Sequence, residues 1–284
     1  MSHNQVNGKV IIAGAGSGDP ELITLKAVRY LQQADVVLTD RLVSDDIIKQ
    51  HVSANAKVIY VGKQCRRGAS TPQETINDLM LQYAFEGKLV VRLKGGDVSV
   101  FSNILDELQV LKQAGISYEI VPGISAALGA AAYAGIPLTA RNYSTAVRLL
   151  TCYKQELLSA DYRRELANTN DTLVFYMSSE NLDEVVDLLR ENNITDDKLL
   201  AVVEQATTPN QNVYTTTFSD YDNTLRGKQF LSPTLVIIGR VVALHEDFAW
   251  IKNSNNRELY FKPVANINTK TQQNNKVQQH VTRA

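Results

Sequence analysis

Short runs of β-branched and apolar residues alternate with amphipathic segments along the first half of the chain. The runs expected to form strands are residues 9–13, 35–39, 57–61, 89–93 and 117–121. The segments expected to form helices are residues 20–33, 44–51, 72–86 and 101–114, followed by a helix of small residues at 125–134. This alternation predicts an α/β domain in which crossover helices join a mostly parallel sheet.

The second half repeats the alternation and predicts a second α/β domain. Strands are expected at residues 146–152, 172–176, 199–203, 212–218 and 234–239, and helices at 181–191 and 219–225. Polar and apolar residues alternate in the run at 212–218, which favours an antiparallel ribbon and hence a mixed sheet. The expected domains are residues 8–139 and 140–252, because 284 residues exceed one average domain. The polar segment 253–284 has too few apolar residues to fold and is expected to be a disordered tail.

Charge and cysteine content exclude several classes of function. A net charge of −1 gives no excess of positive charge of the kind that binds nucleic acid. Neither Cys65 nor Cys152 lies in a metal-ligand motif, so neither structural zinc nor another metal is expected, and a reducing compartment fits best. The N-terminus has no signal-peptide pattern, and no apolar run reaches the roughly 18 residues that span a bilayer. The expectation is a cytoplasmic protein without a membrane partner.

A glycine-rich stretch after the first predicted strand is the first candidate binding loop. Gly14, Gly16 and Gly18 allow positive φ and close approach of a ligand, and Asp19 reads as a helix N-cap before Pro20. A dinucleotide-binding loop would need a third glycine where Asp19 stands, although an acidic residue at position 40 suits the ribose contact of such a site. A glycine-rich turn without a ligand remains an alternative. The small residues of the helix at 125–134 fit either a close ligand or tight helix–sheet packing.

Several longer motifs, in order and at consistent spacing, resemble the uroporphyrinogen-III C-methyltransferases of the tetrapyrrole methylase superfamily across residues 8–251. They are GDP at 18–20, TDRLVSDDII at 39–48, YVGK at 60–63, PQETIN at 72–77, VVRLKGGD at 90–97, VPGISAALGAAAYAGIPLTAR at 121–141, LVFYM at 173–177 and SPTLVIIGRVVAL at 232–244. The resemblance implies two α/β domains with S-adenosylmethionine (SAM) and the substrate in the cleft between them, and a homodimer. It also implies methylation of C2 and C7 of the macrocycle, giving precorrin-2 on the route to sirohaem and corrinoids.

The resemblance also implies roles for individual residues. Asp40 is the candidate proton acceptor and Lys63 the candidate donor, and both groups suit general acid–base chemistry. Residue type alone, without the resemblance, favours a strand-end cap for Asp40 and an ordinary surface charge for Lys63. The implied SAM-binding residues are Ser17, Gly95, Gly96, Asp97, Val100, Ser125, Ala126, Met177 and Ala206, although Met177 also suits a core position. The implied partners of the substrate carboxylates are Arg41, Arg92, Arg141 and Arg148, the last of which equally suits a plain surface role.

Several positions depart from the family pattern and keep two alternatives open. Ser17 stands where the family has proline, Ala140 where it usually has histidine, and Ala206 where it has glycine. Cys152-Tyr153 replaces Gly-His, and the segment after Asp97 lacks the usual glycine-rich arginine segment. One alternative is a non-catalytic paralogue that binds SAM or a tetrapyrrole. The other is a methyltransferase that acts on a different precorrin.

Overall fold

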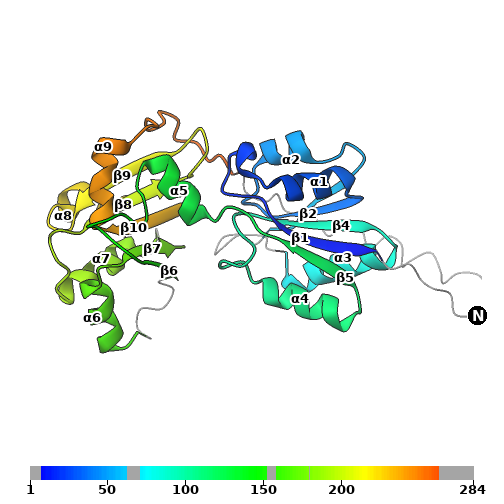
Figure 1. Cartoon of the computed structure of the whole chain (residues 1–284), viewed down its shortest axis with the longest axis horizontal. Coiled ribbons are helices and arrows are strands. Elements are labelled where there is room, and N and C mark those ends of the chain that lie inside the picture. The colour runs from blue at the N-terminus through cyan, green and yellow to red at the C-terminus, as the bar shows by residue number, and fades with distance from the viewer. Residues whose placement is uncertain (1–7, 63–70, 152–157, 179, 262–284) are drawn as a thin grey trace, which may run out of the picture.

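The computed structural model describes residues 8–62, 71–151, 158–178 and 180–261. Two α/β domains lie side by side, each built on a five-stranded sheet (Figure 1). Both sheets carry helices, as the strand and helix patterning predicted. Lys63, Cys65, Cys152 and Tyr153 lie outside the described residues.

The first domain contains an all-parallel sheet in the order β3-β2-β4-β1-β5. Its strands are β1 (Lys9–Gly14), β2 (Val36–Thr39), β3 (Lys57–Tyr60), β4 (Leu89–Lys94) and β5 (Ser117–Val121). The covering helices are α1 (Leu25–Gln33), α2 (Asp45–His51), α3 (Gln73–Phe85) and α4 (Ile104–Gln113). Helices α1 and α2 pack on the face that carries Ile11 and Val91, and α3 and α4 pack on the face that carries Val10 and Val90. Burial on both faces explains the nearly continuous apolar runs of these strands.

Two predicted helices of this domain are shorter than expected. Residues 20–33 divide into a 3₁₀ turn at Pro20–Leu22 and helix α1, because Asp19 and Thr24 each cap a helix start with their side chains. Helix α4 begins only at Ile104, since Phe101 and Asn103 have left-handed φ values of 50° and 54°. The predicted cap at Asp19 is confirmed by a 2.8 Å hydrogen bond from the Glu21 amide.

The second domain contains a mixed sheet in the order β6-β7-β10-β8-β9. Its strands are β6 (Val147–Thr151), β7 (Thr172–Tyr176), β8 (Leu199–Glu204), β9 (Asn212–Thr217) and β10 (Thr234–Gly239). Only β6 and β7 pair in parallel; β9 pairs antiparallel with β8, which confirms the ribbon predicted there. Helices α6 (Ala160–Asn168), α7 (Leu182–Glu191) and α8 (Tyr221–Thr224) cover one face.

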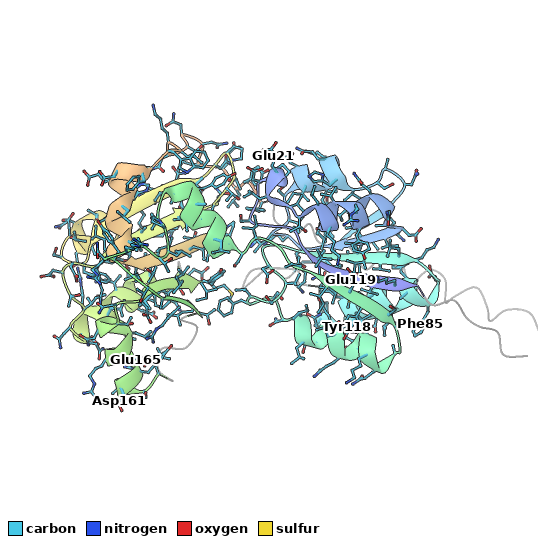
Figure 2. All side chains as sticks on the ribbon, viewed as in Figure 1. Glu21, Phe85, Tyr118, Glu119, Asp161 and Glu165 are labelled. Carbon is cyan, nitrogen blue, oxygen red and sulfur yellow. The ribbon has the colours of Figure 1, made fainter. Side chains whose placement is uncertain are left out.

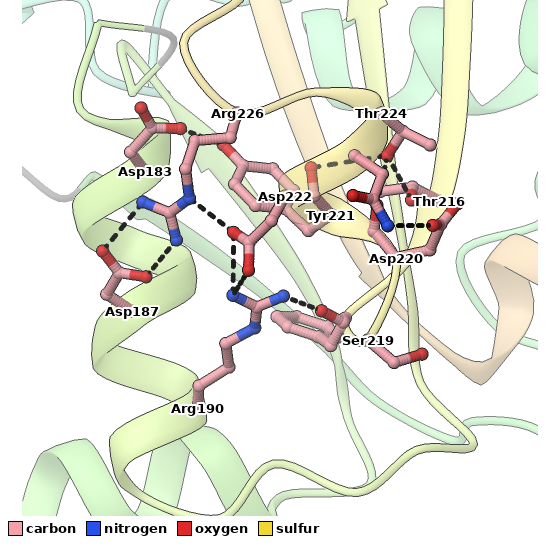
Figure 3. A network of polar contacts seen from close by, with 12 residues as sticks. Asp183, Asp187, Arg190, Thr216, Ser219, Asp220, Tyr221, Asp222, Thr224 and Arg226 are labelled. Atoms are coloured by element: carbon pink, nitrogen blue, oxygen red, sulfur yellow. Dashed lines mark hydrogen bonds and ion pairs between the residues drawn. The ribbon is translucent and has the colours of Figure 1, made fainter.

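An ion-pair network joins α7 to α8 on the outer surface of this domain (Figure 3). Arg226 binds Asp187 on α7, and its Nε donates to Asp222 on α8. Arg190 also reaches Asp222, with 3.0 Å between Nη1 and Oδ2. Burial and the hydroxyl's bond to Asp183 raise the pKa of Tyr221, which lies beneath both arginines. The network thus holds α7 against α8, two of the helices that cover this face of the second sheet.

Helix α5 (Ala126–Ala134) packs on the second sheet rather than on the first. Ala127, Ala130 and Ala131 share one buried cluster with Val174 of β7 and Ile237 of β10, and that cluster also contains Val241 of the 3₁₀ segment Arg240–Leu244. The short helix α9 (His245–Phe248) follows that segment. We therefore propose that the first domain ends at the end of β5, and not at residue 139 as expected from the sequence. The small residues of α5 serve helix–sheet packing, one of the two interpretations left open.

Residues 253–261, which we name the C-terminal strap, return from the second domain to the first. Gln205 holds the strap at two points, through its Nε2 to the Glu258 carbonyl (3.1 Å) and its Oε1 to the Tyr260 amide (2.7 Å). The Tyr260 hydroxyl donates to Asp46 of α2 over 2.7 Å, and Phe261 is 3% exposed. These contacts place residues 253–261 in the folded part of the chain, where the sequence had predicted a disordered tail. The rest of that predicted tail lies outside the described residues.

Candidate active site

The carboxyl ends of four neighbouring strands of the first sheet meet at one edge. Asp40 follows β2, residues 95–97 follow β4, the opening loop (residues 14–19) continues from β1, and Gly123 to Ser125 follow β5. The edge of a parallel sheet where the strand order reverses is the usual ligand position in open α/β folds. The order β3-β2-β4-β1-β5 has its switch here, so the topology brings these predicted residues together.

Gly14, Gly96 and Gly123, which we name the glycine cluster, let the backbones of these loops touch. A Cβ on Gly14 would lie 2.6 Å from the Gly96 carbonyl oxygen, and a Cβ on Gly123 would lie 2.4 Å from the same atom. Gly16 and Gly96 form a short antiparallel bridge, with 2.7 Å from the Gly96 amide to the Gly16 carbonyl. Gly95 packs equally closely on the Leu42 backbone. The predicted backbone surface at residues 95–96 is therefore present, built jointly with the opening loop.

Asp97 fixes the shape of this surface. Its Oδ1 accepts from the Ser99 amide (2.8 Å) and hydroxyl, and its Oδ2 accepts from the Gly123 amide (2.9 Å). Burial raises the pKa of Asp97, but the hydrogen bonds from Ser99 and Gly123 outweigh it and hold the pKa below its ordinary value. An ionised Asp97 thus ties the loop after β4 to the start of the segment after β5. Val100 lies half-buried two residues beyond Val98 in the same loop.

Asp40 is bound by a buried arginine at the end of β2. The Nη2 of Arg92 lies 2.5 Å from Asp40 Oδ1, and the Asp40 side chain remains 28% exposed. Arg92 itself is only 2% exposed and also donates to Glu107 of α4 and to backbone carbonyls. Arg92 therefore acts on Asp40 from inside the domain, which is a different position from the substrate-facing one expected from the sequence.

The second domain supplies the opposite wall. Strands β7 and β8 run in the same direction, so Met177 and the turn at residues 205–208 follow the same edge of the second sheet. The Tyr176 hydroxyl lies 2.6 Å from Ser125 Oγ and 3.1 Å from the Ala127 amide, and its ring packs on Phe101 with 4.9 Å between centroids. Met177 is 62% exposed with φ of 55°, which excludes the core position considered for it.

The opening loop is bonded directly to the second domain. The Thr207 hydroxyl donates to Ser17 Oγ over 3.1 Å and accepts from the Asp19 amide over 3.3 Å. Tyr133 of α5 donates to Asp19 Oδ2 over 2.5 Å. Ser17, Ala126 and Ala206, three of the predicted SAM residues, thus lie on segments that meet where the domains touch, with Ala206 8% exposed.

The remaining predicted arginines are spread across the molecule. Arg148 lies at the start of β6, bound to Asp171 (2.6 Å) and Glu165 (2.6 Å). Asp171 precedes β7, at the end opposite to Tyr176, and Figure 2 shows Glu165 at the lower end of the second domain. The structure therefore does not bring Arg148 to the site. Arg141 lies in an exposed turn before β6, and Arg41 follows Asp40 and is half-buried.

Sequence reasoning missed Glu107, Lys94 and Thr207. Glu107 interrupts an apolar helical stripe that includes Leu108 and Leu111, and a lone carboxylate on such a stripe signals a buried ion pair. Arg92 and Lys94 lie two residues apart in a buried strand, so their side chains leave the same face of the sheet and are candidate partners for Glu107. Thr207 had no such signal, because its φ of 62° belongs to a turn that favours glycine or asparagine.

The sequence predicts neither a metal site nor a membrane-spanning helix. Within the described residues, no group of three or more His, Cys, Asp or Glu side chains is arranged to hold a metal ion. The helices described there are all too short or too polar to cross a bilayer.

Comparison with known proteins identifies the family of the chain. The family model for tetrapyrrole (corrin/porphyrin) methylases matches residues 9–222. The sirohaem synthase of Acinetobacter baylyi is 46% identical over 244 residues, which cover 86% of this chain and 53% of that protein. The chain thus spans about half the length of the curated relatives it matches.

Solved structures agree with this assignment over the whole fold. The uroporphyrin-III C-methyltransferase of Thermus thermophilus is 33% identical with a TM-score of 0.70, and the match covers 86% of this chain and 98% of that one. A structure of that enzyme with S-adenosylhomocysteine is 31% identical with a TM-score of 0.68, covering 84% and 100%. The cobalt precorrin-4 methyltransferase is 31% identical with a TM-score of 0.71, covering 82% and 95%. The motifs, the paired α/β domains and these matches together show that the chain belongs to the tetrapyrrole methylase family.

Proposed function

We propose that the chain is a SAM-dependent C-methyltransferase that converts uroporphyrinogen III to precorrin-2 by methylation at C2 and C7. The observation that carries the proposal is that the glycine cluster and Asp40 lie at one edge of the first sheet, where Ser17 and Phe101 contact Thr207 and Tyr176 of the second domain. The similarity to the Thermus enzyme, one structure of which contains S-adenosylhomocysteine, supports both donor and acceptor.

The residues at the glycine cluster fit a nucleoside-type donor. Cβ atoms on Gly14 or Gly123 would fill the space where three backbones meet, so only glycine permits that surface. Asp97 supplies a fixed negative charge beside it, and the exposed Met177 supplies a polarisable apolar wall. We propose that Gly95, Gly96, Asp97, Val100, Ser125 and Ala126 hold the donor together with Ser17, Met177 and Ala206.

SAM, when bound, supplies an electrophilic methyl group on a sulfonium. Because a methyl transfer is an in-line displacement, the chain's main task is to align donor and acceptor and to exclude water. We propose that Asp40, held by Arg92 and still partly exposed, accepts the proton that leaves the methylated carbon, and that Lys63 donates a proton. Arg41 and Arg141 are proposed to pair with the acceptor's carboxylates.

An anaerobic assay with methyl-labelled SAM and uroporphyrinogen III tests this function. The expected product carries two added methyl groups, identified by mass spectrometry. Asp40→Asn is expected to lower turnover at least tenfold with the affinity for S-adenosylhomocysteine unchanged. Asp196→Asn, an exposed carboxylate at the opposite end of β8, is the matched control and should keep full turnover.

Absence of label from the tetrapyrrole would refute the proposed acceptor. If a panel of methylated precorrins accepts label instead, the chain acts on another precorrin. If none does while S-adenosylhomocysteine still binds, the non-catalytic alternative holds.

We further propose that the chain forms a homodimer and acts in the cytoplasm. An apolar groove of about 750 Å³ lies over α5, β6 and α9, and its lining includes Leu128 (58% exposed) and Phe248 (59% exposed). Exposed apolar patches of this kind are typical of protein interfaces. Sedimentation analysis should find a dimer, and Leu128→Glu should convert it to a monomer. The paucity of cysteine supports a reducing compartment.

A further inference from the structure

A charged cluster is buried directly behind Asp40. It consists of Arg92 and Lys94 on β4, Glu107 on α4, and Asp40 itself. Arg92, Lys94 and Glu107 are 2%, 4% and 0% exposed, whereas the Asp40 side chain is 28% exposed. Three members are therefore inside the domain, and the fourth presents the cluster to the site.

The fold places these groups together for a simple reason. Arg92 and Lys94 lie two residues apart on β4, so both side chains leave the sheet on the face that α4 covers. Glu107 lies on the buried side of α4, and its Oε1 accepts from Arg92 Nε (3.0 Å) and from Lys94 Nζ (2.9 Å). One carboxylate oxygen thus anchors both cations.

The guanidinium of Arg92 is held on every side. Its Nε binds Glu107, its Nη1 donates to the carbonyls of Leu38 (3.3 Å) and Leu93 (3.2 Å), and its Nη2 reaches Asp40. Because a guanidinium is planar, fixing Nε and Nη1 also fixes the direction in which Nη2 points. The position of the Asp40 carboxylate is therefore set from Glu107, through Arg92.

The cluster brings four ionisable side chains into contact. Two cations face two carboxylates, in a region from which water is largely excluded. Burial lowers the pKa of Arg92, but Asp40 and Glu107 outweigh it and raise that pKa above its ordinary value. Burial and repulsion from Arg92 lower the pKa of Lys94, opposed by Glu107. Glu107 thus partly cancels the positive charge that Arg92 presents to Asp40.

We propose that Glu107 is a positioning residue for the reaction: through Arg92 it holds the Asp40 carboxylate at the proton-accepting position. Its Oε2 supports this role, because this buried atom has no hydrogen-bond partner within the described ranges. An unsatisfied buried carboxylate oxygen costs stability, and such costs are retained where a site needs them. The inference rests on the proposed role of Asp40 and adds the groups that orient it.

Kinetics of Glu107→Ala and Glu107→Gln test the proposal. Removal of the anchor in Glu107→Ala should lower kcat at least tenfold, since a displacement of about 1 Å at a reacting group costs up to roughly 100-fold. The KM for SAM and the affinity for S-adenosylhomocysteine should stay within twofold. Glu107→Gln keeps an oxygen that accepts from Arg92 Nε, so it should recover most of the lost kcat.

Two further variants separate positioning from general loss of stability. Arg92→Lys keeps the positive charge but loses the planar guanidinium that fixes the directions of its contacts to Glu107 and Asp40, so its kcat should also fall at least tenfold. This variant tests the proposal if Glu107→Ala does not fold. Lys198→Met, in the other domain, is the matched control, because Lys198 is 4% exposed like Lys94 and its Nζ donates to the backbone carbonyl of Ala167. It should lower the melting temperature and leave kcat unchanged.

Crystal structures of the wild type and Glu107→Ala give a readout that needs no turnover. The expected difference is loss of the contact between Arg92 and Asp40. A folded Glu107→Ala with kcat within twofold of the wild type, or with Asp40 still held by Arg92, would overturn the proposal. If the wild type methylates nothing, the proposed function fails, and the displacement of Asp40 still decides whether Glu107 positions it.

Discussion

The contact among three backbones at the glycine cluster allows a sharp prediction about Gly123. In Gly123→Ala the new Cβ would lie 2.4 Å from the Gly96 carbonyl oxygen and 2.8 Å from the Gly14 carbonyl carbon. Both are backbone atoms, so no side chain can rotate away. Since ordinary contacts begin near 3.4 Å, the loop after β4 must move by about 1 Å relative to β5.

The structure sets the size of both expected effects. Overpacking of a close-packed site costs about 1–3 kcal/mol, and each kcal/mol lowers the melting temperature of a chain this large by about 2–4 °C. The same movement displaces Gly96 and loosens the 2.9 Å bond from the Gly123 amide to Asp97, both of which belong to the proposed donor site. We therefore expect the affinity for S-adenosylhomocysteine to fall at least tenfold, about 1.4 kcal/mol or more.

Calorimetry of donor binding and thermal melting check this prediction together. Gly115→Ala is the control: Gly115 has a left-handed φ of 67°, so alanine costs about 1–2 kcal/mol of backbone strain, but its Cβ would have no atom within 4 Å. Both variants should melt earlier, and only Gly123→Ala should lose donor affinity. Donor affinity within twofold of the wild type in Gly123→Ala would refute the role of the glycine cluster.

Three further predictions concern the contacts between the domains and one rejected site residue. Burial and the hydrogen-bonded carboxylates of Asp19 and Asp46 raise the pKa values of Tyr133 and Tyr260 to about 12. The stability that these tyrosines add is therefore complete below about pH 10 and is lost as pH rises from about 10 to 12. Tyr133→Phe should reduce the fall in melting temperature measured over that pH range. Deleting residues 253–284 exposes the surface covered by Phe261 and should lower the free energy of unfolding, measured in urea, by about 2–3 kcal/mol. A chain that ends at Phe261 should keep the wild-type free energy of unfolding, and equal stability of the two truncated chains would show that the strap adds nothing. Arg148→Gln should leave the KM for the tetrapyrrole unchanged, and a severalfold rise would return Arg148 to the substrate site.

The sheets could be predicted well because their signal is local. The apolar runs of β1, β7 and β10 are buried on both faces, so their apolar residues are nearly continuous and mark the strands clearly. The candidate donor loops follow those strands directly, and the parallel topology brings them to one edge. Strand patterning therefore shows that residues 95–97 and the opening loop follow neighbouring strands, whereas their role as donor residues comes from the family resemblance.

The features that sequence reasoning missed depend on which element packs on which. Helix α5 has almost no large side chains, so no apolar stripe showed that it belongs to the second sheet. Helix α6 escaped notice because most of its residues are polar. The polar strap is held by hydrogen bonds from Gln205 and Asn210, whose side chains face it only in the folded chain. Arg92 looked like a substrate contact because its partner, Glu107, is supplied by the next helix.

The strand order of the first sheet also has a consequence for how this protein is made. β4 lies between β1 and β2 and pairs with both. Lys9 of β1 pairs with Leu89, and Val36 of β2 pairs with Val90, so neither strand can form these pairs until β4 has been synthesised. During synthesis the first half of the sheet cannot close until β4 leaves the ribosome, and loop closure of this length slows folding. Residues 95–97 are translated immediately after that closing strand. A nascent chain that ends before residue 97 therefore cannot present these donor-loop residues on a closed sheet, and translation products truncated before that point should not bind SAM.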